Sequence, residues 1–103
     1  MHADIAQKRD GLIALCRRYD VARLEVFGSA ARGTDFDPHS SDADFLVRFR
    51  PGSQLPRLEQ FFGFARALEQ LLGRRVDLVE AGAIRNPFLL AAIEKAREVV
   101  YAQ

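Results

Sequence analysis

The sequence lacks the features that would build a disulfide-linked or membrane-spanning protein. Its one cysteine, Cys16, cannot form a disulfide within the chain, which fits a reducing compartment. The longest apolar run, Phe88 to Ile93, is far shorter than the ~20 residues that a membrane span needs. The first residues also lack the charged-then-apolar pattern of a signal peptide. We therefore expect a cytoplasmic protein with no membrane contact.

The charge balance and the length of the chain limit the possible functions further. Fifteen Lys and Arg residues against 14 Asp and Glu residues leave a net charge of +1, and neither sign gathers in a block. Direct binding of nucleic acid is therefore not expected. With 103 residues, and without repeats or linkers, we expect one domain over residues 1–103. An enzyme of this size would have to use a small substrate, or one that another subunit presents.

Apolar periodicity predicts an α/β fold, in which strands separated by helices form a small sheet flanked by about four helices. A short helical turn after Ser29 counts among these helices. The pattern alone does not give the strand order. The other expected elements are a helix over 4–19, strands over 24–27 and 42–49, a helix over 56–72, a strand over 76–80, a helix from Asn86-Pro87 to Ala96, and a strand over 99–101.

The apolar residues of the predicted helix over 56–72 cover about half of its circumference, more than the ~100° stripe of an ordinary surface helix. We expect core packing for Leu58, Phe62, Ala65 and Leu72. Phe64 and Leu71 lie at the far edge of this face. They indicate either a protein interface or a core that wraps around the helix.

Two aspartates stand at the start of the predicted strand over 42–49. Asp42 and Asp44 are separated by one residue, so they point to the same side of the strand, ~6.6–7 Å apart. Upstream, Gly28 and Ser29 form a turn whose backbone N–H groups suit a phosphate. A third carboxylate, Asp77, lies on the strand face opposite Val76 and Leu78. Together these residues predict a metal-bound nucleotide.

The segment between the turn and the aspartates reads as an exposed loop. Asp35, Asp37 and His39 are candidates for extra metal ligands, although loop composition explains them without a metal. Arg32 is placed to add a cation at the phosphates, and a structural salt bridge is the alternative.

Three segments of the chain resemble motifs of the nucleotidyltransferase superfamily that includes DNA polymerase beta, and most closely its smallest members, the minimal nucleotidyltransferases. The likeness covers essentially the whole chain. The segments are Phe27-Gly28-Ser29-Ala30-Ala31-Arg32-Gly33, Ser41-Asp42-Ala43-Asp44-Phe45-Leu46-Val47 and Arg75-Val76-Asp77-Leu78-Val79.

The resemblance implies a mixed, twisted sheet that carries the three carboxylates on one face. It also implies transfer of AMP from ATP, with two Mg²⁺ ions held by Asp42, Asp44 and Asp77. Asp42 and Asp44 are the expected ligands of the nucleotide's metal, and Asp77 is expected beside the acceptor hydroxyl. Gly28, Ser29 and Arg32 would bind the β- and γ-phosphates.

Minimal nucleotidyltransferases act as antitoxins paired with HEPN-type toxins, and they transfer AMP to a toxin tyrosine. The resemblance therefore implies a HEPN-type partner that delivers the acceptor hydroxyl. Two alternatives stay open: an inactive antitoxin that neutralises its partner by binding, and a transferase acting on a small molecule such as an antibiotic. The apolar helix face would serve the partner or a homodimer.

Overall fold

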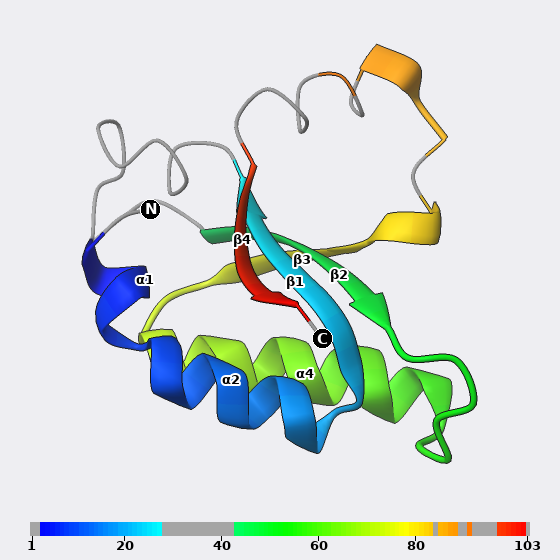
Figure 1. The fold of residues 1–103 in the computed structure, drawn as a ribbon, viewed down its shortest axis with the longest axis horizontal. Helices are drawn as coiled ribbons and strands as arrows, with labels where there is room; N and C mark the ends of the chain where they lie inside the picture. The colour runs from blue at the N-terminus through cyan, green and yellow to red at the C-terminus, as the bar shows by residue number, and fades with distance from the viewer. Residues whose placement is uncertain (1–2, 28–42, 84, 89–90, 92–96, 103) are drawn as a thin grey trace.

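The computed structural model describes residues 3–27, 43–83, 85–88, 91 and 97–102 (Figure 1). Four strands form one sheet in the order β3-β2-β1-β4. The elements, in chain order, are α1 (Ala3–Gln7), α2 (Arg9–Arg18), β1 (Val21–Phe27), β2 (Ala43–Phe49), α4 (Arg57–Leu72), β3 (Val76–Glu80), the 3₁₀ helix η1 (Ala81–Ala83) and β4 (Glu98–Ala102).

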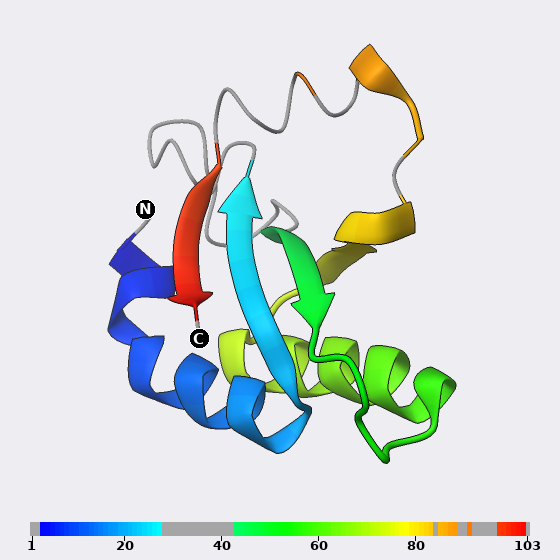
Figure 2. The same ribbon diagram turned by 45° about the vertical axis from the view of Figure 1, so that its right-hand side comes forward.

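The sheet is mixed, as the resemblance implied. β1 pairs antiparallel with both β2 and β4, whereas β2 and β3 run parallel. Because parallel strands need a crossover connection, α4 links β2 to β3. Figure 2 shows β4, β1 and β2 side by side, with α2 and α4 running along one side of the sheet.

The core lies between the sheet and these two helices. In β2 the residues Ala43, Phe45 and Val47 are fully buried, whereas on the other face Asp44 is half-buried, Leu46 is 6% exposed and Arg48 is exposed. This alternation is the one predicted for a strand with one face on the core. The core cluster also draws on α1, α2, β1, α4 and β4, through Ile5, Leu12, Cys16, Val21, Leu24, Val26, Phe64, Leu68 and Val100.

The expected helix over 4–19 is wrong in detail, because it is interrupted at Lys8. The backbone N–H of Lys8 donates to the Ile5 carbonyl, three residues back, at 3.1 Å. The Lys8 carbonyl in turn accepts from Leu12 at 2.9 Å, four residues on, which begins α2. Both halves still bury apolar residues in one core, so the amphipathic reading holds on each side of the break.

The prediction for the apolar face of α4 is wrong for Leu58 and Phe62, whereas Leu72 packs against the core as expected and the core wraps to Phe64 and Leu71, one of the two alternatives. Phe64 is fully buried, and Leu71 packs against the core beside Gly11. Leu58 and Phe62, expected in the core, are 73% and 58% exposed. The buried stripe follows Gln60, Phe64 and Leu68, at helical spacing. None of the described helices is long and apolar enough to cross a membrane.

The ends of α4 and the start of the next helical segment agree with the sequence. Gly73 ends α4 in the left-handed conformation, with φ 68°, which a residue without a side chain adopts at little cost. Further on, the Asn86 side chain accepts a hydrogen bond from the backbone N–H of Phe88 at 2.9 Å, an N-cap that starts a turn at Pro87. Most of the helix expected to reach Ala96 lies outside the described residues.

The single cysteine, Cys16, is free and buried in the core. Burial raises the pKa of the Cys16 thiol from 9.0 to about 12, because the thiolate would lose its hydration. We expect a disulfide reagent to label Cys16 at pH 8 only after denaturation. In denaturant titrations the folded state should lose stability between pH 9 and 12, because only the unfolded chain releases the thiol proton there. Cys16→Ala should remove that part of the pH dependence. Rapid labelling of Cys16 in the native chain would contradict the burial of its thiol.

Candidate active site

The candidate site residues that the structure describes lie on the outer face of the sheet, which we define as the side turned away from α2 and α4. Strand alternation puts these residues there, because their neighbours in sequence point into the core. The outer face carries Arg23, Glu25 and Phe27 of β1, Asp44, Leu46 and Arg48 of β2, and Asp77 of β3.

Asp44 and Asp77 lie directly beside each other on this face. They are register partners in the parallel pair of β2 and β3, so their Cα atoms are separated by roughly one strand spacing, ~4.8 Å. Val76 and Leu78, on either side of Asp77, pack against the core, as predicted. Folding therefore brings together two carboxylates that stand far apart in the sequence.

Two carboxylates at paired strand positions concentrate negative charge that a bound cation would offset. The two carboxylates offer oxygen ligands and negative charge, which suit Mg²⁺. This ion favours one or two carboxylates together with substrate phosphates and water. The described residues contain no group of three metal-ligating side chains. The third predicted ligand, Asp42, lies outside them. Asp44 and Asp77 therefore fit two of the three expected positions.

The remaining predicted site residues, Gly28, Ser29, Arg32 and Asp42, also lie outside the described residues, as do the loop candidates Asp35, Asp37 and His39. Their neighbours in the sequence are described. β1 ends at Phe27, directly before Gly28, and β2 starts at Ala43, directly after Asp42. Phe27 is the register partner of Asp44, so both strand ends border the Asp44–Asp77 pair.

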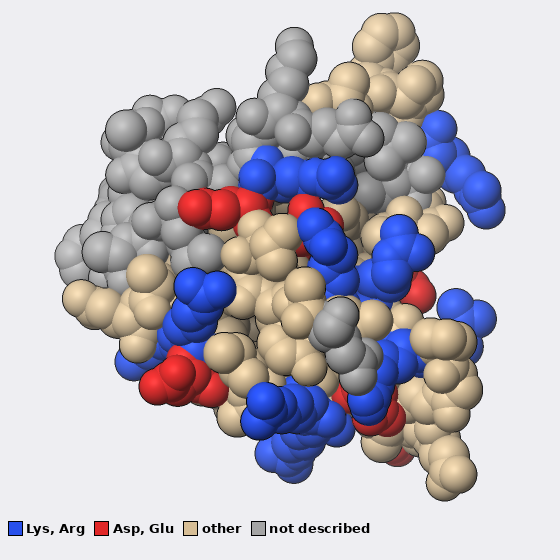
Figure 3. All heavy atoms as spheres, in the orientation of Figure 1, with Lys and Arg blue, Asp and Glu red and all other residues tan. Residues whose placement is uncertain are grey.

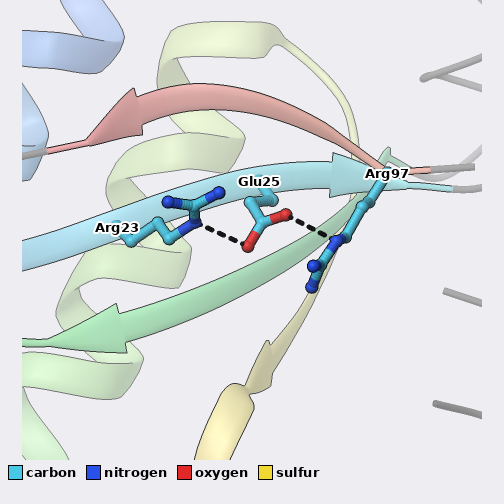
Figure 4. A network of polar contacts seen from close by, with 3 residues as sticks. All are labelled: Arg23, Glu25 and Arg97. Atoms are coloured by element: carbon cyan, nitrogen blue, oxygen red, sulfur yellow. Dashed lines mark hydrogen bonds and ion pairs between the residues drawn. The ribbon is translucent and has the colours of Figure 1, made fainter. Parts of the chain in front are cut away.

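Sequence reasoning missed one residue of this face, Glu25. It is 4% exposed, and its carboxylate contacts Arg23 of β1 and Arg97, which directly precedes β4 (Figure 4). A glutamate between the apolar residues Leu24 and Val26 must find partners if its strand is central, but the sequence does not show that this strand is central. Figure 3 shows Lys and Arg side chains grouped over the strand layer, with Asp and Glu side chains beside them.

Comparison with known proteins decides the family. The nucleotidyltransferase domain family matches residues 10–100. The chain belongs to this family. A predicted protein adenylyltransferase of Methanocaldococcus jannaschii, MJ0128, is 37% identical over 89% of this chain and 87% of its own length. The protein adenylyltransferase MntA of Thermococcus cleftensis is 38% identical over 84% of this chain and 80% of its own.

Solved structures show the same nucleotidyltransferase fold. A predicted minimal nucleotidyltransferase superimposes with a TM-score of 0.74 at 33% identity, covering 95% of both chains. A toxin–antitoxin complex with AMP-PNP contains a chain with a TM-score of 0.69 at 22% identity, covering 92% of this chain and 73% of that one. A complex of tri-AMPylated Shewanella oneidensis HEPN toxin with MNT antitoxin gives 0.65 at 18%, covering 96% and 73%. The last two similarities are evidence for the fold alone.

Proposed function

We propose that this nucleotidyltransferase moves AMP from ATP to a tyrosine hydroxyl of a HEPN-type toxin and so acts as its antitoxin in the cytoplasm. The observation that carries the proposal is the register pairing of Asp44 with Asp77 on the outer face of the sheet. Two neighbouring carboxylates can hold the divalent ions that assist phosphoryl transfer. The proposal treats residues 1–103 as one domain.

Each site residue has a distinct task in this proposal. Asp42 and Asp44 would hold the metal of the nucleotide, and Asp77 would hold the metal beside the acceptor or accept the proton of the acceptor hydroxyl. Gly28, Ser29 and Arg32 would bind the β- and γ-phosphates. Two Mg²⁺ ions, when bound, stabilise negative charge on the attacking and leaving oxygens.

The relatives support the choice of donor and acceptor. MntA of Thermococcus cleftensis is named a protein adenylyltransferase, and chains of the same fold occur in a toxin–antitoxin complex with AMP-PNP and in a complex with a tri-AMPylated HEPN toxin. We therefore propose ATP as co-substrate, and an acceptor that receives more than one AMP in succession.

Intact-mass analysis tests this directly. The protein is incubated with ATP, Mg²⁺ and the HEPN-type product of the neighbouring reading frame, and the mass of that product is followed with time. We expect stepwise gains of AMP that require Mg²⁺ and stop on addition of a chelator. A mass that stays constant at millimolar ATP and Mg²⁺ would refute the transferase.

A second function, neutralisation by contact, is favoured by the exposed apolar residues of α4. Leu58 and Phe62 line two open grooves, one shared with Tyr19 and Leu55 and the other with Phe61. Both side chains are more than half exposed, which is unusual for large apolar residues next to each other on one helix. We propose that an apolar helix of the toxin packs on Leu58 and Phe62, whether or not AMP is transferred.

Phe62→Glu should then weaken toxin binding by roughly 30-fold or more, since truncating or charging an interface anchor costs about 2 kcal/mol or more. Titration calorimetry against the toxin measures the change in Kd. Gln70→Glu is the matched control, because it adds the same charge to an exposed position of the same helix. Equal Kd values for Phe62→Glu, Gln70→Glu and the unmodified protein would exclude this face from the interface.

A further inference from the structure

Glu25 is a buried carboxylate with two arginines on the outer face of the sheet. Its side chain is 6% exposed. The Nε of Arg23 donates to Oε1 at 2.9 Å, and the Nε of Arg97 lies 3.2 Å from Oε2 (Figure 4). Removing a carboxylate from water is costly unless cations compensate for it. Glu25 therefore fixes the positions of two guanidinium groups.

Arg23 and Arg97 can each bind a second anion. Their side chains are 44% and 41% exposed, and among the described residues each contacts Glu25 through Nε. The buried Oε2 also lacks a well-aligned hydrogen bond, although Arg97 is in ion-pair distance. Arg48, exposed and opposite Arg23 in register, adds a third cation. Two guanidinium groups on one carboxylate, with Arg48 on the neighbouring strand, leave an excess of positive charge that suits a phosphate.

The position of this arginine cluster, Arg23, Arg48 and Arg97, relative to Asp44 indicates which phosphate it would bind. Along β1, Glu25 precedes Phe27, the register partner of Asp44, and Gly28 follows Phe27. Arg97 directly precedes Glu98, the register partner of Val26, so it is level with Phe27, and the arginine cluster extends from there toward the start of β1. Because the proposed function assigns the β- and γ-phosphates to Gly28 and Ser29, the arginine cluster is left to bind a phosphate of the acceptor.

A tyrosine hydroxyl carries no charge that would call for such a cluster, whereas an acceptor that already bears AMP has a phosphodiester. Resting on the AMP transfer proposed above, we propose that Arg23 and Arg97, positioned by Glu25, bind the phosphodiester of an AMP already joined to the acceptor and so promote the next addition. Leu46, the register partner of Glu25, is two residues from Asp44 along β2, or ~6.6–7 Å. The bound phosphate would therefore lie close to the reacting groups.

The chemistry of the later addition is the same as that of the first. A ribose hydroxyl oxygen of the attached AMP forms a bond to the α-phosphorus of a second ATP. The bond from that phosphorus to the oxygen bridging to the β-phosphate breaks, and pyrophosphate leaves. The hydroxyl proton passes to Asp77 and then to water. The arginines take no part in bond exchange and act as positioning residues.

The test compares successive additions in one time course. Arg97→Gln and Arg23→Gln are incubated with ATP, Mg²⁺ and the toxin, and intact mass gives the rates of the first and second additions. A charge-assisted contact to phosphate contributes about 1.5–3 kcal/mol, so the ratio of second to first rate should fall roughly tenfold or more. High salt should reduce the same ratio in the unmodified protein.

Two further variants separate binding from folding. Glu25→Gln combined with Arg97→Gln leaves no unpaired carboxylate in the buried position, so it should lower the ratio without the loss of stability expected from Arg97→Gln alone. Arg17→Gln, an exposed arginine of α2 on the other side of the sheet, should keep the ratio unchanged. An unchanged ratio in Arg97→Gln and Arg23→Gln, or an equal slowing of both additions, would overturn this inference. Absence of any AMP on the toxin with the unmodified protein would instead overturn the proposed function.

Discussion

Asp77→Asn should reduce AMP transfer by roughly 1,000-fold or more while the chain stays folded. Asparagine keeps the size of the side chain but removes the negative charge that a metal or the acceptor proton needs. Losing a single preorganised group that stabilises charge in a transition state costs about 100- to 1,000-fold, and loss of a metal ligand adds to this. Asp77 is exposed, so its replacement disturbs no packing. Single-turnover transfer of labelled AMP to the toxin measures the effect.

Asp44→Asn should act through nucleotide binding as well as chemistry. In the unmodified protein Mg²⁺ with ATP should raise the melting temperature, and a chelator should cancel the rise, because only the folded chain binds the complex. Asp44→Asn should abolish this shift, whereas Asp77→Asn should retain part of it. Asp10→Asn, an exposed carboxylate in the first turn of α2, is the matched control and should behave like the unmodified protein. Label transfer that survives in both Asp44→Asn and Asp77→Asn would show that the metal ligands are assigned wrongly.

The pairing of Asp44 with Asp77 shows what sequence periodicity can and cannot predict. Alternation placed Asp44 on the side of β2 away from Phe45, and Asp77 on the side of β3 away from Leu78, and both predictions are confirmed. The register between the two strands follows from how α4 carries the chain back across the sheet, which is a property of tertiary packing. Only the resemblance to a known family indicated that the two carboxylates share one face.

Glu25 escaped detection for a related reason. A charged residue between apolar neighbours in a strand is ordinary when the strand has one face in water. Its burial arises because β1 is central, with β2 on one side and β4 on the other, and because Arg97 reaches it from the start of β4. The periodicity of apolar residues does not give the strand order, so no sequence pattern around Glu25 alone could predict its partners.

The error in α4 has a different cause. Apolar residues occupy about half of the helix circumference, so their positions in the sequence do not determine which of them form the centre of the buried stripe. The structure places that centre at Phe64, between the ring of Tyr19, with centroids 5.7 Å apart, and the ring of Phe49, at 6.1 Å. Both partners come from elements distant in sequence. Tyr19, which directly follows α2, and Phe49 of β2 therefore help to decide which part of a broad apolar face becomes core.

Phe64→Ala should consequently lower the free energy of unfolding by about 3–5 kcal/mol, the range for removing a buried phenylalanine and leaving a cavity. The side chain is fully buried and contacts two aromatic rings, so little surrounding structure can collapse into the space. A loss of this size is a large part of the stability of a small domain. Urea denaturation followed by circular dichroism measures it.

Phe62→Ala provides the matched control, since it makes the same chemical change two residues earlier in the same helix. Because Phe62 is 58% exposed, its loss should change the free energy of unfolding by less than about 1 kcal/mol. It should instead weaken toxin binding. The two variants thus separate the roles that the broad apolar face of α4 combines. Equal destabilisation by Phe62→Ala and Phe64→Ala would mean that the core wraps around the helix and that no apolar surface remains for a partner.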